Sequence, residues 1–159
     1  MKDQTCCFTG HRHVPAADRA ALEQRLEAEI VDLIRQGVRY FGAGGALGFD
    51  TMAALAVLRL KPEYPHIRLI LVLPCKEQDK GWDEPNKKTY NQILRQADKV
   101  VYVSEQYARG CMHERNRHLV EHSGACVCYL TGTKGGTADT VRYARQKGLQ
   151  IINLAAYAY

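Results

Sequence analysis

The fold of this chain is best read from the segment Ala125-Cys-Val-Cys-Tyr-Leu-Thr-Gly-Thr-Lys-Gly-Gly-Thr-Ala-Asp-Thr140. Its first six residues, 125–130, are apolar throughout, which predicts a strand covered on both faces of a parallel sheet. A glycine-containing loop, 131–137, follows, and apolar residues then recur at helical spacing from Thr137 to Lys147. The segment therefore predicts a strand, a tight loop and a helix in direct succession.

The loop between this strand and this helix is a candidate anion site. It contains Gly132, Gly135 and Gly136, and Thr137 opens the helix. Unpaired backbone N–H groups and the positive end of a helix would meet there, an arrangement that favours phosphate. Glycine lets a ligand approach the backbone closely and permits positive φ. A structural turn without a ligand explains Gly135 and Gly136 equally well, and the spacing matches neither the Rossmann nor the Walker A pattern.

Composition predicts one soluble domain spanning residues 1–159. The chain has 46% hydrophobic and 25% charged residues, which is ordinary for a globular protein. No apolar run is long enough to cross a membrane and no signal segment opens the chain, so we expect a cytoplasmic protein without a membrane partner. The sequence is compatible with a homodimer.

The net charge and the positions of the histidines and cysteines limit the kinds of ligand that we expect. The net charge is +5, but the basic residues are scattered, which favours a small phosphorylated ligand over nucleic acid. His11 and His13 form an H-x-H pair without an evident third ligand, so we predict no metal, and we expect no required cofactor. Six cysteines form no C-x-x-C pair and lie mainly in apolar runs, which indicates reduced, buried thiols.

Strands and helices are predicted to alternate along the whole chain. A first helix is expected to end at Gly37 and a polar loop to occupy 74–85. The other expected helices are 49–60, 87–97, 111–122 and 137–147, and the expected strands are 4–9, 38–43, 68–73, 100–103, 125–130 and 150–154. This alternation predicts an α/β fold, a single Rossmann-like doubly wound domain with a mainly parallel sheet of about six strands and helices on both faces. Ligands of such sheets bind beyond the carboxyl ends of the strands, near the switch point.

Three glycine-containing loops are predicted to meet at that end of the sheet, namely 9–13, 43–48 and 131–137. The first carries a hydroxyl, a bare backbone and two potential cations, a set that suits a phosphate or a ribose, although an ordinary surface loop is the alternative. Its candidate binding residues are Thr9, Gly10, His11 and Arg12, and those of the second loop are Gly44, Gly45 and Gly48. The convergence of three such loops favours the phosphate interpretation.

Two further positions carry polar chemistry on predicted helices. Asp50 opens the helix after the second loop, where it either stabilises the helix start or bonds a ligand hydroxyl. Arg115 and Asn116 border the face on which Met112 is expected to pack. A long arginine and an amide at the edge of a buried face are costly unless they are paired or directed at a ligand. All three are candidate binding residues.

Taken together, these motifs resemble the YpsA-like family of the SLOG superfamily, which also contains the LOG enzymes and the DNA-processing protein DprA. The resemblance covers nearly the whole chain and implies a Rossmann-like fold that binds nucleotides or nucleotide-derived ligands. Its motifs are Thr5-Cys-Cys-Phe-Thr-Gly-His-Arg12, Gly45-Ala-Leu-Gly-Phe-Asp50, Glu77-Gln-Asp-Lys-Gly-Trp82, Tyr90 with Ala97-Asp98, Arg115-Asn116 and Gly135-Gly136-Thr137.

The LOG phosphoribohydrolases, which cleave the base from a nucleoside monophosphate, differ from this chain at one decisive position. Their arginine-bearing helix is matched by Met112-His-Glu-Arg115, with Asn116 in place of a lysine. The resemblance places their catalytic glutamate at Thr140, and Asp139 lies on another helix face. A carboxylate that would stabilise an oxocarbenium-like transition state is thus missing.

We therefore expect a binding module for a nucleotide or nucleotide-derived ligand, without enzymatic activity. A LOG-like hydrolase of the N-glycosidic bond is the alternative. DprA-like binding of single-stranded DNA is less favoured, because the charge is modest and no row of aromatic residues accompanies a basic stripe.

Overall fold

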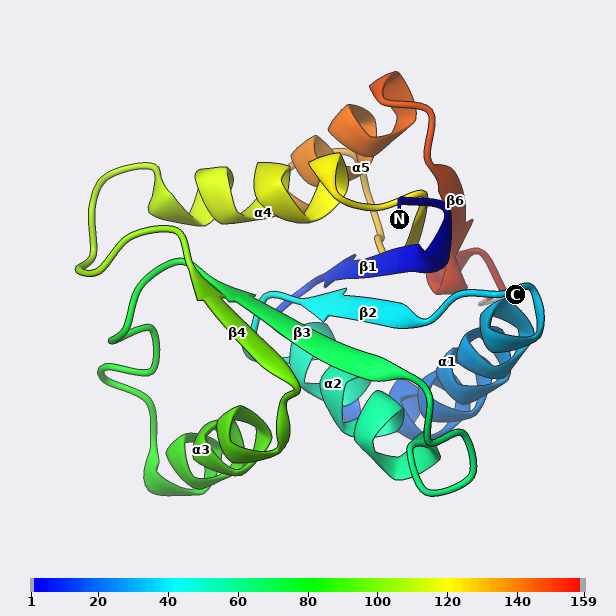
Figure 1. The fold of residues 1–159 in the computed structure, drawn as a ribbon. Helices are drawn as coiled ribbons and strands as arrows, with labels where there is room; N and C mark the ends of the chain where they lie inside the picture. The colour runs from blue at the N-terminus through cyan, green and yellow to red at the C-terminus, as the bar shows by residue number, and fades with distance from the viewer. Residues whose placement is uncertain (1, 158–159) are drawn as a thin grey trace.

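The computed structural model describes residues 2–157 and places helices on both faces of a parallel sheet (Figure 1). Residues 1, 158 and 159 of the predicted domain lie outside this description. The elements in chain order are η1 Lys2–Gln4, β1 Thr5–Gly10, α1 Ala16–Arg35, β2 Tyr40–Ala43, α2 Phe49–Leu60, β3 Arg68–Leu73, α3 Glu84–Gln96, β4 Lys99–Tyr102, α4 Cys111–Glu121, β5 Ala125–Tyr129, α5 Gly136–Gln146, β6 Gln150–Asn153 and η2 Leu154–Tyr157. Within these residues, no helix has both the length and the apolar character needed to span a bilayer.

The sheet has the strand order β4-β3-β2-β1-β5-β6, and every neighbouring pair is parallel. The chain runs outward from β1 to β4, returns across the sheet through α4, and then runs outward in the other direction from β5 to β6. The direction of winding therefore changes between β1 and β5, which is the switch point of the sheet. The predicted doubly wound, parallel sheet with helices on both faces is confirmed.

Most predicted boundaries differ from the observed ones by one to three residues, and two of the differences have a clear cause. The predicted loop 74–85 is too long, because Asp83 caps α3 by accepting a hydrogen bond from the Asn86 amide at 2.9 Å. Pro85 also suits the first turn of a helix. Strand β2 begins later than predicted, because the Val38 amide donates to the carbonyl of Leu33 at 3.0 Å and so closes the end of α1.

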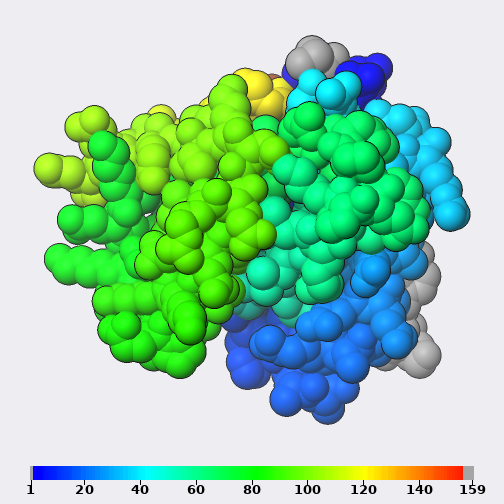
Figure 2. Space-filling view, turned by 60° about the horizontal axis from the view of Figure 1, so that its bottom comes forward, coloured from blue at the N-terminus to red at the C-terminus, as the bar shows by residue number. Residues whose placement is uncertain are grey.

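Helices α1, α2 and α3 cover one face of the sheet with the larger of two apolar cores (Figure 1). Leu22, Leu26 and Ile30 project from α1 at helical spacing and are fully buried, as are Phe8 and Phe41, whose rings stack with centroids 6.1 Å apart. Figure 2, which turns this side toward the viewer, shows the side chains of these helices forming a continuous surface.

Helices α4 and α5 cover the opposite face with a smaller core. Cys7 and the pair Cys126 and Cys128 belong to it, whereas Cys6 lies in the larger core. Adjacent cysteines on β1 therefore point to opposite faces, as expected for a strand. All six cysteines are buried, as predicted for thiols in apolar runs.

Candidate functional site

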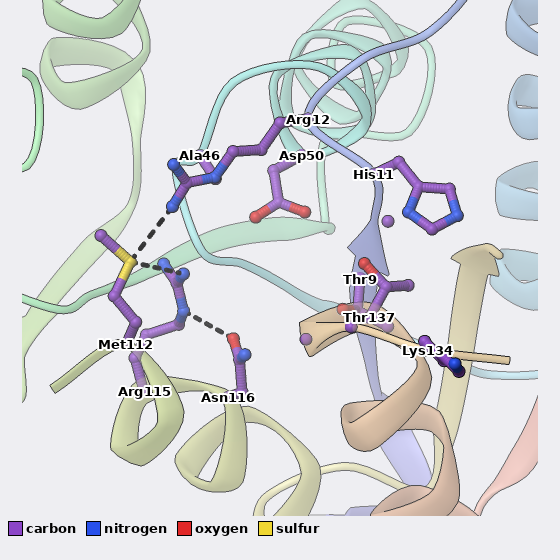
Figure 3. A pocket seen from close by; sticks show the side chains of 13 residues that line it. Thr9, His11, Arg12, Ala46, Asp50, Met112, Arg115, Asn116, Lys134 and Thr137 are labelled. Carbon is purple, nitrogen blue, oxygen red and sulfur yellow. Dashed lines mark hydrogen bonds between the residues drawn. The ribbon is translucent and has the colours of Figure 1, made fainter. Parts of the chain in front are cut away.

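The carboxyl ends of β1 and β5 lie side by side, because Gly10 is the register partner of Tyr129. The loops that follow these strands lead to opposite faces of the sheet, so they diverge and leave a cleft. A cavity of about 360 Å³ opens there (Figure 3). Its lining consists of Thr9, Gly10, His11, Arg12, Ala46, Asp50, Met112, Arg115, Asn116, Lys134, Gly135, Gly136 and Thr137.

Most of the predicted binding residues thus line one cavity, but four glycines do not. Gly44 lies behind it, where its carbonyl accepts hydrogen bonds from Arg115 and Gln78. Gly45 packs against Leu73, and Gly132 faces open space. The fourth, Gly48, lies against the backbone of His11 and Arg12.

Gly48 joins the first and second predicted loops. Its φ is +78°, a conformation that favours glycine. A Cβ at this position would collide with the carbonyl group of Arg12, and the next residue, Phe49, donates its amide to the carbonyl of His11 at 3.1 Å. The absence of a side chain therefore lets the start of α2 lie against the first loop, which fixes the position of Asp50.

Asp50 extends its carboxyl group into the cavity (Figure 3). The residue is only 6% exposed, and its Oδ1 atom is buried without a hydrogen-bond partner among the described residues. Burial raises the pKa of Asp50 to about 6, although Arg115, the Ala46 amide and Arg12 oppose the rise. At neutral pH this group is therefore mainly a carboxylate with one unused acceptor, an arrangement that is costly without a ligand.

Arg115 reaches the cavity from α4 and is 4% exposed. Its guanidinium donates to the Gly44 carbonyl, to Asn116 Oδ1 at 2.8 Å and more weakly to Gln78 Oε1 at 3.4 Å. Burial lowers the pKa of Arg115 from its usual value, while Asp50 raises it; an arginine nevertheless stays charged. The two buried charges thus share the site, and no ion pair joins them within residues 2–157.

Arg12 crosses the mouth of the cavity and approaches α4 (Figure 3). Its Nη2 lies 3.4 Å from Met112 Sδ, and Arg115 contacts the same sulfur at 3.8 Å. Sequence reasoning assigned Met112 to the packing face, and its position one helical turn before Arg115 was the signal that could have placed it here. Because a thioether is a weak acceptor, Arg12 and the Nη2 group of Arg115 keep the capacity to donate hydrogen bonds to an anion.

The start of α5 forms the opposite wall. No side chain caps the amides there, because Gly135 occupies the N-cap position with φ +102°. A side chain at Gly136 would project into open space. Lys134, a neighbouring cation in the glycine loop that sequence reasoning overlooked, also lines the cavity. Free amides, a helix N-terminus and a cation together suit an anionic group.

His11 lines the cavity but directs its ring toward the loop after β5. Its Nε2 accepts a hydrogen bond from the Thr131 amide at 2.9 Å, and the ring packs edge-on against Tyr129. The same nitrogen also lies 3.2 Å from both the carbonyl oxygen and the hydroxyl of Thr131. His11 connects the first and third predicted loops.

Helix α5 supplies no carboxylate to the cavity from the described residues. Thr140 is 7% exposed and does not line the cavity, and its hydroxyl donates to the Gly136 carbonyl at 2.9 Å. Asp139 is paired with Arg142 on the exposed side of the helix. Asp50 is thus the carboxylate that the described residues bring to this cavity. Residues 2–157 contain no group of three or more side chains arranged to hold a metal ion.

Comparison with known proteins agrees with this architecture. Residues 7–155 match a family model named YpsA and described as the YspA SLOG family. The uncharacterised SPbeta prophage-derived protein YoqJ of Bacillus subtilis is 36% identical over 138 residues, which cover 79% of this chain and 81% of that protein. A UPF0398 protein of Halalkalibacterium halodurans is 33% identical over 132 residues, which cover 81% of this chain and 70% of the relative.

Two solved structures share the fold. DNA processing protein A from Helicobacter pylori, whose single-stranded DNA binding mode has been described, superposes with a TM-score of 0.69 at 21% identity over 94% of this chain. DprA from Streptococcus pneumoniae gives a TM-score of 0.67 at 18% identity over 92% of this chain. The matches span 64% and 48% of those two chains, respectively.

Proposed function

This chain belongs to the YpsA SLOG family, and on that premise we propose that it binds a nucleotide or a nucleotide-derived ligand in the cavity between β1 and β5. The observation that carries the proposal is the unused Oδ1 of buried Asp50 in the same cavity as the uncapped start of α5. One end of the site offers an acceptor and the other offers amide donors. A nucleotide has matching groups, since its ribose donates hydroxyl protons and its phosphate accepts hydrogen bonds.

In this proposal Asp50 accepts a hydrogen bond from a sugar hydroxyl, and the amides of α5 hold a phosphate with Lys134. Arg12 and Arg115 add positive charge across the cavity. The interaction favours the charged form of Asp50 and so lowers its pKa on binding. Binding near pH 6 should therefore release protons.

The proposal is tested first by native mass spectrometry of protein purified without added ligand, and then by calorimetry with AMP. We expect Asp50→Asn and Gly136→Val to weaken AMP binding at least tenfold, because one removes the acceptor charge and the other places a branched side chain at the phosphate site. Asp32→Asn is the matched control, since Asp32 lies on α1 outside the cavity. Unchanged affinity in both folded variants would contradict the proposal.

We propose a binder rather than a hydrolase, because Thr140 stands where the resemblance places the catalytic glutamate of the LOG enzymes, and a threonine has no charge to stabilise the developing positive charge on the sugar. Incubation with AMP should therefore release no free base. If base is released, and if this release disappears in Asp50→Asn, Asp50 acts as the missing carboxylate and the LOG-like alternative is correct. Activity gained only in Thr140→Glu would support the binding role of the natural chain.

Single-stranded DNA is the second candidate ligand, since the Helicobacter pylori DprA that shares the fold is described as binding it. We expect at most weak binding that does not depend on strand length near physiological salt. Tight, length-dependent binding in an anisotropy titration, with an affinity that falls steeply as salt rises, would favour this candidate instead.

A further inference from the structure

A second cavity lies under the C-terminal half of α4, at the opposite end of that helix from Arg115. It has a volume of about 270 Å³. Leu119 of α4 packs directly over Gly42 of β2, where a Cβ would lie 2.9 Å from Leu119 Cδ2. Beside this contact, side chains of β3 and β4 form the floor of a groove.

The floor of the groove is apolar. Ile70 and Val72 from β3 and Val101 from β4 line it, together with the ring of Tyr40. Ile70 and Val101 are only partly buried, although the other sides of these strands are covered by α2 and α3. An apolar group placed here would remove their remaining surface from water, which is favourable.

The rim of the groove carries one lysine, Lys99, and two histidines. Lys99 is exposed and makes no ion pair within residues 2–157, and no carboxylate lines the cavity. His118 and His122 from α4 stack with ring centroids 4.2 Å apart. The groove therefore combines an apolar floor with an ammonium group that has no counterion among residues 2–157.

We propose that this groove is a second binding site, which takes a small aliphatic carboxylate with its chain on the apolar floor and its charge beside Lys99. The volume lies just below the roughly 300–1,000 Å³ of common ligand sites, so the ligand is small. A second copy of the chain fits less well. A symmetric contact would bring two sets of Lys99, His118 and His122 into one interface, and the groove contributes no carboxylate to pair with them.

The site is independent of the proposed nucleotide cavity. The two share helix α4 but no lining residue. Octanoate is the probe, and 1-octanol, which has the same chain without the charge, is its control. Binding is followed by calorimetry and mapped by amide chemical shifts in the full-length protein.

We expect octanoate to shift amides of β3, β4 and the end of α4, and to bind at least tenfold more tightly than octanol. Lys99→Glu should weaken octanoate binding at least tenfold, whereas Lys88→Glu, an exposed lysine on α3, should leave it unchanged. Val101→Trp should abolish binding by filling the groove.

Any one of five results would overturn the proposal. Octanol that binds as tightly as octanoate, or an unaltered affinity in Lys99→Glu, would show that charge plays no part. Shifts confined to other regions, or no binding at all, would exclude the site. A dimer in light scattering that dissociates in Val101→Trp would assign the groove to a second copy of the chain instead.

Discussion

The two faces of the sheet are built differently. The face covered by α1, α2 and α3 holds a continuous core of fully buried side chains. The face covered by α4 and α5 holds a smaller core, and α4 borders both cavities described above. Asp50, at the start of α2, is the buried carboxylate that the well-packed side contributes to the cavity between β1 and β5. The larger core therefore lies on one face of the sheet, whereas both cavities border the helix α4 of the other.

The same substitution on each face tests this comparison with the largest expected effect. Leu26 on α1 is fully buried, and Leu119 on α4 is 5% exposed beside the groove. We expect Leu26→Ala to lower the free energy of unfolding by about 4 kcal/mol and Leu119→Ala by about 2 kcal/mol, since a site next to a cavity collapses more easily.

Urea unfolding measures both values, and equal slopes with urea concentration would show that the unfolded states are comparable. A loss for Leu119→Ala as large as that for Leu26→Ala would break the comparison. It would mean that α4 contributes as much to the core as α1 does.

The buried carboxylate of Asp50 lowers the stability of the folded protein. Its pKa of about 6, against an ordinary 3.8, means that the folded protein binds this proton more tightly than the unfolded chain does. Above pH 6 the buried charge therefore costs stability, of the order of 2–3 kcal/mol. We expect Asn at position 50 (Asp50→Asn) to raise the free energy of unfolding at pH 7 by up to about this amount.

The stability gained in Asp50→Asn depends on pH, because the pKa of Asp50 is raised in the folded protein. The contribution of Asp50 to stability is fully present below about pH 4 and is lost as the pH rises through 6. The difference between Asp50→Asn and the natural chain should therefore shrink as the pH falls from 7 to 4. A variant that is less stable at pH 7 would show that Asp50 holds the fold together instead.

The smallest effects are expected at the periphery, where the two faces should not differ. Lys61 pairs with Asp98 at 2.6 Å on the first face, and the guanidinium of Arg117 lies 4.5 Å from the ring centroid of Tyr143 on the second. Each contact is partly exposed, so Lys61→Ala and Arg117→Ala should each cost less than about 1 kcal/mol. A cost above this range at either position, in thermal unfolding, would show that the difference between the faces extends to their surfaces.

The sequence predicted the order and type of the elements well, because alternating apolar runs and helical spacing are local signals. The boundaries were less accurate, since they depend on individual hydrogen bonds. The Val38 amide closes α1 and does not extend β2, and Asp83 starts α3 earlier than the pattern indicated. The hydrogen bonds that set these boundaries depend on the folded geometry, which the pattern of apolar residues does not specify.

The candidate site was predicted only in part, because sequence patterns mark the ends of strands but not the contacts between distant residues. Loop glycines and their polar neighbours mark the ends of strands, so residues such as Arg12 and Gly136 were recognisable. The roles of Gly44 and Gly48 were not, because both act behind the cavity by approaching other backbone or side-chain atoms closely. Met112 gave no polar signal, since its contribution depends on where α4 lies relative to the first loop.

The single return of the chain across the sheet divides the molecule into two segments that complete each other. The first segment, 2–103, supplies β1 to β4 with α1 to α3, and the second, 111–157, supplies β5 and β6 with α4 and α5. Neither contains the whole cavity, because Asp50 belongs to one and Arg115 to the other. The exposed loop 105–110 between them is therefore a suitable place to divide the chain into two fragments, so that the pair serves as a split-protein reporter. Ligand binding would return only when both fragments reassemble.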